Sequence, residues 1–537
     1  MSPRAIVPVL SAVTLLTGCW SPSTSRDSAD EQVYGILAKV TEQVTGAPTT
    51  HKLDRPIDTL RNRLLNSKEP VHLDLFQALD VAAENSREFQ RQKESLYLAA
   101  LSLTREQHNF ALRFSDVASG EVSGQADDTA DADLSNNLSA SVNTVAGTRI
   151  VASFFNTFMR SLIHGGRFDG GSILNLTLTQ PLLSGAGQRI VREPLTQAER
   201  EVVYSVRDFE RFRADFSISV VSEYWNVVRQ MTDLVNVEAN YRSLSTSREQ
   251  IEELYKAGRK TVTDLGRAKQ SEYSADVSRV EAKNRLESAM DRFKLTLGLP
   301  INAQVELDPD ELKRLTALGV ENIDLEESTA VALALQRRYD FQTVVDSVED
   351  AGRRILVSED ALDMSLDFTA ALNVPSESGK DLNLDWSRVN WSAGFELDLA
   401  LDKLVERNAY RSALISFDLA VRNREQSEDQ ITADVRSSLR NIQSAIDTYR
   451  IQTMAVQLAE QRVEANTDLY AAGRVEAFEK LDAQDALISA QLQLTAAIVD
   501  YHVAKLQLMN DLEAIDLEHE GLRFDPALPM PQLKTGE

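Results

Sequence analysis

The chain has a single cysteine and only six histidines among its 537 residues. A lone cysteine cannot form an internal disulfide and excludes a cysteine-rich zinc site. The scattered histidines leave little for a metal centre or a catalytic triad. Glycine (22 residues) and proline (14 residues) are also scarce, which excludes a flexible linker and a collagen-like chain. The composition therefore predicts a protein that is not an enzyme and holds no metal.

Basic residues are in deficit, with 57 Lys and Arg against 82 Asp and Glu and a net charge of −25. A nucleic-acid partner is therefore not expected, because such a protein needs basic groups to offset phosphates. Long apolar runs are missing too, since no segment after the N-terminus has the 18 or so apolar residues of a transmembrane helix. If the mature chain crosses a membrane, only a β-barrel would satisfy its backbone there.

The N-terminus has the pattern of a secretory signal. Arg4 is followed by an apolar run from Ile6 to Leu16 and then by Thr-Gly-Cys19, which is too short to span a bilayer. Leu-Thr-Gly-Cys resembles the lipobox of bacterial lipoproteins, which implies removal of residues 1–18 and lipid, palmitate included, on Cys19. Trp20 rather than Asp follows, which in lipoproteins fits sorting to the outer membrane. The alternative is an ordinary buried cysteine.

Two copies of one pattern follow each other in the chain. Ala78 and Phe89 correspond to Ala330 and Phe341 at an offset of 252 positions, and the offset falls to 219 and then to 215 further along. The later matches are Leu178 with Leu397 and Tyr255-Lys-Ala-Gly-Arg259 with Tyr470-Ala-Ala-Gly-Arg474. Fixed-order similarity indicates a duplicated unit, and the shrinking offset indicates longer insertions in the first copy.

This duplication predicts the domain organisation. We expect a signal peptide at 1–18, a lipid-tethered linker at 19–71, a first repeat at 72–300, an inter-repeat linker at 301–326, a second repeat at 327–515 and a tail at 516–537.

Each copy contains segments that alternate between apolar and polar residues. The alternation is clear at 174–179, 363–372 and 391–402 and weaker within 134–156. A period of two predicts strands with one apolar and one polar face, so we expect strand pairs at about 134–183 and 363–402. Segments 119–137 and 165–171, rich in Gly, Asp and Ser, predict surface loops.

Four strands are too few to close a barrel, because about eight is the smallest number seen. Open edges would leave unpaired backbone groups in lipid, each costing several kcal/mol. Glu396 and Asp398 on the polar face suit a water-filled lumen, and Trp391 with Phe154, Phe155 and Phe158 suits an interfacial aromatic girdle. We therefore expect three protomers to share one barrel of twelve strands. The alternative is a soluble sandwich with its polar face to water.

Two long segments lack both glycine and proline, from Leu195 to Ala257 and from Leu401 to Ala472. At 1.5 Å per residue they could form helices of roughly 95–110 Å. Apolar residues from Val202 to Val220 recur at spacings of three and four. We expect long helices paired across turns at Gly258 and Gly473.

The segment Leu176–Leu183, the following Gly185-Ala-Gly187 and the segment Pro194–Arg200 are similar to the passage from strand into long helix in TolC-like outer-membrane efflux proteins. Phe293–Pro300 resembles the end-of-repeat signature of that family, and the likeness covers roughly residues 72–515. It implies a mainly α fold with a small β part. In this fold, long helical hairpins form a periplasmic barrel, and four strands per protomer enter a trimeric 12-stranded β-barrel.

The same resemblance implies a passive exit duct for efflux or type I secretion, held in outer-membrane lipid. The homotrimer would dock with a periplasmic adaptor protein and an inner-membrane transporter. An alternative of another class is a lipid-anchored periplasmic coiled-coil adaptor or scaffold without a pore. Adaptors usually carry one helical hairpin, whereas this pattern occurs twice.

The resemblance also assigns roles to the two Tyr-x-Ala-Gly-Arg turns, which would be the periplasmic tips. Gly258, Arg259 and Gly473 would contact the adaptor. The closed entrance would be held by contacts of Tyr470 with Thr263 and Asp264. The family's second basic gating residue is replaced by Val475, beside Arg474.

Two acidic residues follow the second tip. Glu479 and Asp482 are spaced i,i+3 and share one helix face. In a trimer the resemblance implies a ring of six carboxylates at the tunnel mouth, which would attract cations. The alternative is a solvated helix face in an acidic protein.

Overall fold

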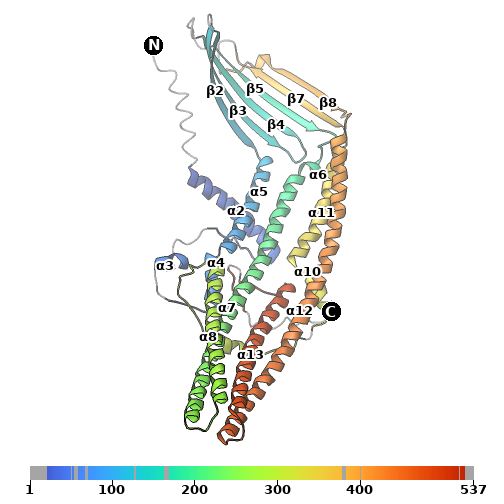
Figure 1. Ribbon diagram of the computed structural model, residues 1–537. Coiled ribbons are helices and arrows are strands. Elements are labelled where there is room, and N and C mark those ends of the chain that lie inside the picture. Colours follow the sequence, from blue (N-terminus) through green and yellow to red (C-terminus); the bar gives the residue numbers. More distant parts are fainter. Residues whose placement is uncertain are drawn as a thin grey trace. The chain divides into compact units, whose positions relative to one another are not determined.

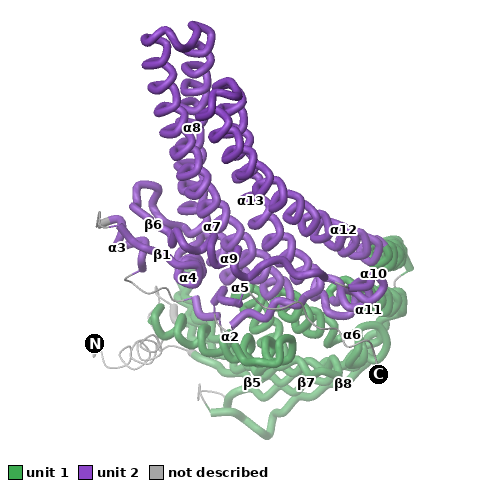
Figure 2. Tube along the Cα trace, turned by 90° about the horizontal axis from the view of Figure 1, so that it is seen from below, with its two compact units in different colours: residues 1–50, 96–206, 343–425 green, residues 51–95, 207–342, 426–537 purple. Residues whose placement is uncertain are grey.

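The computed structural model describes residues 21–49, 51–53, 59–66, 70–125, 129–161, 169–323, 325–377, 383–399, 401–518 and 521–525. The chain divides into two compact units, which Figure 2 colours green and purple. Unit 1 comprises residues 1–50, 96–206 and 343–425, and unit 2 comprises the rest. The predicted signal peptide and Cys19 lie outside the described residues. Across those ranges, no helix is both long and apolar enough to span a bilayer.

The helices confirm the duplication. In the first copy they are α4 (Leu75–Asn85), α5 (Arg87–Asn109), α7 (Glu193–Lys256) and α8 (Val262–Thr296). In the second copy they are α10 (Glu327–Arg337), α11 (Tyr339–Asp360), α12 (Leu404–Ala471) and α13 (Ala477–Asp511). α4 and α10 begin 252 positions apart, and α8 and α13 both begin and end 215 positions apart. These are the offsets of the sequence matches.

Shorter elements connect these helices. They are α2 (Pro22–Thr45), α3 (Leu60–Asn66), β1 (Val71–Leu73), α6 (Gln188–Val191), β6 (Val305–Leu307), α9 (Glu311–Leu318) and the 3-10 turn η2 (Trp386–Arg388). β1 pairs with β6 in parallel. The segment expected to be an inter-repeat linker therefore contains a strand and a helix.

The core of unit 2 explains the end-of-repeat motif. α8 ends at a turn in which Gly298 has a φ of +73°, and the Leu299 N–H donates to the Lys294 carbonyl oxygen at 2.8 Å. A Cβ atom on Gly298 would lie 2.1 Å from the Asn85 carbonyl oxygen. Only glycine satisfies both the left-handed backbone and this close approach.

The main sheet belongs to unit 1 and has six antiparallel strands in the order β2-β3-β4-β5-β7-β8 (Figure 1). The strands are β2 (Arg113–Gln125), β3 (Thr129–Asn143), β4 (Arg149–Ser161), β5 (Asp169–Pro181), β7 (Ser365–Pro375) and β8 (Asn390–Asp398). The expected number of four strands per protomer is therefore wrong.

The error lies in the first copy. Most of the segment 119–137, expected to be a loop, lies in β2 and β3, with residues 126–128 outside the described part. Residues 134–156, expected to hold one strand, hold most of β3 and more than half of β4. Alternation in β2 and β3 rests on Ser, Ala, Gly, Asn and Asp, so it produces little hydrophobic contrast. In the segment 165–171, residues 169–171 begin β5, and the others are not described.

The strand register gives the sheet one apolar and one polar face. Paired residues lie on the same face, so Phe114, Ala140, Ala152, Leu176, Leu372 and Trp391 form one row across it. We call the face with this row the apolar face. Phe154 and Phe158 belong to it as well, whereas Phe155 lies on the opposite, polar face.

Candidate functional site at the helical tips

The long helix of each copy ends in the same glycine turn. At the first tip Gly258 has a φ of +72°, and the Arg259 N–H donates to the Leu254 carbonyl oxygen at 2.8 Å. At the second tip Gly473 has a φ of +67°, and the Arg474 N–H donates to the Leu469 carbonyl oxygen at 2.9 Å. Both are Schellman caps, in which a left-handed glycine satisfies the last helical carbonyls.

The tip residues predicted to contact an adaptor all reach the surface. Gly258, Arg259 and Gly473 are exposed, and so is Arg474, which was predicted to belong to the gate. The two tips belong to unit 2, at the lower end of Figure 1. Side chains beyond the glycines distinguish the two tips.

Asp264 at the first tip caps its own helix. Its carboxylate accepts hydrogen bonds from the Thr261 backbone N–H at 3.0 Å and from the Thr261 hydroxyl at 2.8 Å. The Asp264 N–H donates in turn to the Thr261 hydroxyl oxygen at 3.1 Å, which completes a capping box. These hydrogen bonds, the backbone one first, lower the pKa of Asp264. Thr263, the other predicted partner of Tyr470, is exposed in the same helical turn.

Tyr470, in the last turn of α12, packs against an apolar cluster with residues from both copies. The cluster consists of Leu244, Ile251, Ala268, Ala275, Ala477 and Leu481. The Nζ atoms of Lys260 and Lys480 lie 5.1 and 5.4 Å from the centre of the tyrosine ring, within the range of cation–π attraction.

The Tyr470 hydroxyl is buried and has no hydrogen-bond partner among the described residues. Burial and then the nearby Asp264 charge raise its pKa. The structure thus brings Tyr470 close to Asp264 without a hydrogen bond between them.

The two acidic residues of α13, Glu479 and Asp482, differ in their partners. Asp482 forms an ion pair with Arg462 of α12, whereas Glu479 is exposed and has no ion-pair partner among the described side chains. Arg267 of α8 lies over the ring of Phe478, 5.3 Å from its centre.

Sequence reasoning missed Lys260, Lys480 and Arg462. The offset of 215 contained a signal for the first of them, because Lys260 corresponds to Val475. The basic residue that the second tip lacks is therefore present at the matching position of the first tip. Arg462 lies 20 positions before Asp482, and no local spacing indicates that pair.

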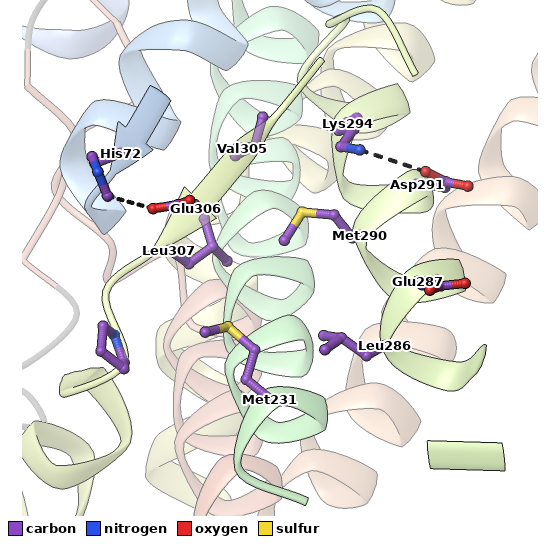
Figure 3. A pocket seen from close by; sticks show the side chains of 11 residues that line it. His72, Met231, Leu286, Glu287, Met290, Asp291, Lys294, Val305, Glu306 and Leu307 are labelled. Carbon is purple, nitrogen blue, oxygen red and sulfur yellow. Dashed lines mark ion pairs between the residues drawn. The ribbon is translucent and has the colours of Figure 1, made fainter. Parts of the chain in front are cut away.

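Unit 2 also has an apolar groove beside β6 (Figure 3). Met231, Leu286, Met290 and Leu307 line it, and ion pairs join His72 to Glu306 at 3.2 Å and Lys294 to Asp291 at 3.6 Å. Its charged groups are largely paired with one another, so the groove offers mainly apolar contacts. No cluster of three or more His, Cys, Asp or Glu that could hold a metal occurs in the described ranges.

The family model described as outer membrane efflux protein matches residues 324–512, a range that contains the helices and strands of the second copy from α10 to α13. Outer membrane protein TolC of Escherichia coli (strain K12) is 22% identical over 374 residues, or 66% of this chain and 72% of that protein. The sequence resemblance to TolC-like proteins is therefore confirmed by an independent match.

Solved structures with the same fold include two outer membrane channels. The Campylobacter jejuni CmeC outer membrane channel superposes with a TM-score of 0.62 at 15% identity, over 84% of this chain and 87% of that one. The open state of the Neisseria gonorrhoeae MtrE outer membrane channel gives a TM-score of 0.59 at 14% identity, over 82% and 88%. The mainly helical, duplicated fold with a small antiparallel sheet is thereby confirmed.

Proposed function

We propose that this chain, which is similar to TolC-like outer membrane efflux proteins in sequence and fold, forms the exit duct of a tripartite efflux or type I secretion system. Small molecules or polypeptides would pass through it without catalysis. The observation that carries this proposal is the apolar face of the sheet. Trp391 is 77% exposed there, and Phe114 and Phe395 are each 71% exposed, as expected of side chains that contact lipid.

The polar face would then line the water-filled passage. Its charged side chains are mostly acidic, with Glu121, Asp131, Asp133, Asp367, Glu396 and Asp398 against Arg113 and Arg149. An acidic lining attracts cations and repels anions.

Both edges of the sheet, as far as the structure describes it, are open in a single protomer, at β2 and at β8. Unpaired backbone groups cost several kcal/mol each in lipid, so a closed wall requires neighbouring protomers. This need supports the homotrimer that the family resemblance implies.

We place the closed gate at the tips. Tyr470, Lys260 and Asp264 lie together there, with Thr263 and Arg474 exposed beside them. Lys260 supplies the cation that Val475 does not, so it takes the place of the missing gating residue. Glu479 and Asp482 form the tunnel-mouth ring, and Arg462 offsets part of its charge.

The remaining partners follow from the same assignment. Lipid on Cys19 would anchor each protomer in the outer membrane, and the exposed turns at Gly258, Arg259 and Gly473 would receive a periplasmic adaptor linked to an inner-membrane transporter. Mass spectrometry of the mature protein tests the lipid, since Cys19→Ser would remove it.

Recording in planar lipid bilayers tests the duct. We expect the detergent-extracted full chain to be a trimer and to give stepwise conductance with a preference for cations. A periplasmic adaptor or scaffold without a pore would give no conductance, and a stable water-soluble monomer would contradict the proposal.

A further inference from the structure

The first copy contains a β-hairpin that the second copy lacks. Between α11 and β7 there are only four residues, 361–364, whereas β2 and β3 both lie between α5 and β4. This hairpin accounts for most of the fall in the offset between the copies. It extends the sheet beyond the four strands of the family pattern.

The hairpin covers the edge at which a four-stranded protomer would end. β3 pairs with β4 along the whole of that strand, from Asp131–Ser161 to Asn143–Arg149. A neighbouring protomer could therefore reach the β4 edge only if this ladder came apart. The open edges of the described sheet are those of β2 and β8.

The directions of these two edges suit each other. Every neighbouring pair from β2 to β8 is antiparallel, so β2 and β8, the first and sixth strands, run in opposite directions. A β8 strand placed beside the β2 strand of another copy would continue the antiparallel order. The unpaired backbone groups of each edge strand would then form hydrogen bonds with the edge strand of the neighbouring protomer.

The two faces also continue across such a junction. On the apolar face, Phe114 and Val122 of β2 are each 71% exposed, and Trp391 and Phe395 of β8 are comparably exposed. Asp116 is the charged residue that β2 contributes to this face, and its carboxylate accepts a hydrogen bond from the Asn136 side-chain amide at 2.6 Å. The carboxylate therefore has a partner within the sheet.

We propose that β8 of each protomer pairs with β2 of the next, so that three copies build a wall of 18 strands rather than 12. This inference rests on the trimeric duct of the proposed function. Barrel diameter grows roughly in proportion to strand number, so the wall would be about 1.5 times wider than with 12 strands. The hairpin would add Glu121, Asp131 and Asp133 to the lumen, against Arg113.

Disulfide cross-linking tests which strands meet. Side chains on the same face of neighbouring antiparallel strands have Cβ atoms about 4.5–5.5 Å apart, close to disulfide distance. Ser392→Cys or Glu396→Cys in β8 is combined with Ser115→Cys or Ser119→Cys in β2, all on the polar face. The four combinations sample the register. Matched controls combine the same β8 cysteines with Ser153→Cys or Thr157→Cys in β4.

We expect at least one β8–β2 combination to give covalent trimers on denaturing, non-reducing gels, and the β8–β4 combinations to give none. Covalent trimers from β8–β4 alone, in a protein that still conducts, would overturn the 18-strand wall and leave the proposed duct intact. The absence of any trimer or conductance in the unmodified chain would overturn both. The unmodified chain, with Cys19 as its only cysteine, is the background control.

Discussion

The two tips have the same backbone conformation and differ in the contacts that their side chains make. Gly258 and Gly473 close the same turn, and the next helix begins four residues later in each copy. At the first tip Thr261 and Asp264 cap that helix, whereas the matching residues of the second tip, Glu476 and Glu479, make no such cap. The glycine turn has therefore been kept in both copies, because the backbone requires it. The acidic residue six positions later has diverged, since only Asp264 caps its helix.

The largest expected effect is a loss of stability on replacing Gly298, a third glycine whose φ is similar to those of the two tip glycines. Gly258→Ala and Gly473→Ala have open space around the new methyl group, so each should cost only the left-handed strain of about 1 kcal/mol. Gly298→Ala adds a clash with the Asn85 carbonyl, and should cost more than about 3 kcal/mol or prevent folding. Thermal unfolding in detergent measures all three. Equal losses would show that the close approach at Gly298 is unimportant.

The second prediction concerns the two acidic residues at matching positions. Asp264→Ala should lower the unfolding free energy by about 1 kcal/mol, because it breaks a capping box, whereas Glu479→Ala should change it by less than about 0.5 kcal/mol. Asp264→Asn is the matched control, since the amide oxygen can still accept from Thr261 while the charge is lost.

This contrast should depend on pH. The pKa of Asp264 lies below its ordinary value of 3.8 in the folded chain, so its contribution to stability is present above that value. The contribution is lost as the pH falls through the lowered pKa. Denaturant melts of the wild type and Asp264→Asn should therefore converge in acid. A difference that persists unchanged at pH 2 would contradict this account.

The third prediction distinguishes the contribution of the Tyr470 ring to the closed tip from that of its hydroxyl. The ring attracts Lys260 and Lys480, and each contact contributes about 0.5–1 kcal/mol at an exposed site. Tyr470→Leu should therefore loosen the tip and raise resting conductance more than Tyr470→Phe, which loses only a hydroxyl without a partner. Lys260→Met should act in the same direction as Tyr470→Leu. If Tyr470→Phe alone opens the channel fully, the hydroxyl holds the gate through another protomer.

Much of this arrangement could be predicted from the sequence, because long helices and glycine turns leave strong local signals. The absence of glycine and proline from Leu195 to Ala257 predicted α7, and the repeated Gly-Arg turns predicted both tips. The β2–β3 hairpin was missed because its alternation uses small and polar residues, although the falling offset indicated an insertion there. The Arg462–Asp482 pair could not be predicted, since it depends on the register of two packed helices.

The smallest expected effect distinguishes the two carboxylates of the proposed tunnel mouth, and it should appear in ion selectivity with little change in stability. Asp482 is paired with Arg462, so much of its charge is already offset, whereas Glu479 is exposed without an ion-pair partner in the described structure. Glu479→Gln should therefore reduce the preference for cations more than Asp482→Asn. Arg462→Gln should increase that preference, because it releases the Asp482 charge.

Reversal potentials in asymmetric salt measure this series, with unfolding melts as the control for stability. Each change should be no more than about twofold in the permeability ratio at physiological salt, because charges in contact with water are screened within about 8 Å. Equal effects of Glu479→Gln and Asp482→Asn would mean that Arg462 turns away from Asp482 in the trimer. In that case the ring would carry all six charges, and the second tip would differ from the first in its charge as well as in its missing cap.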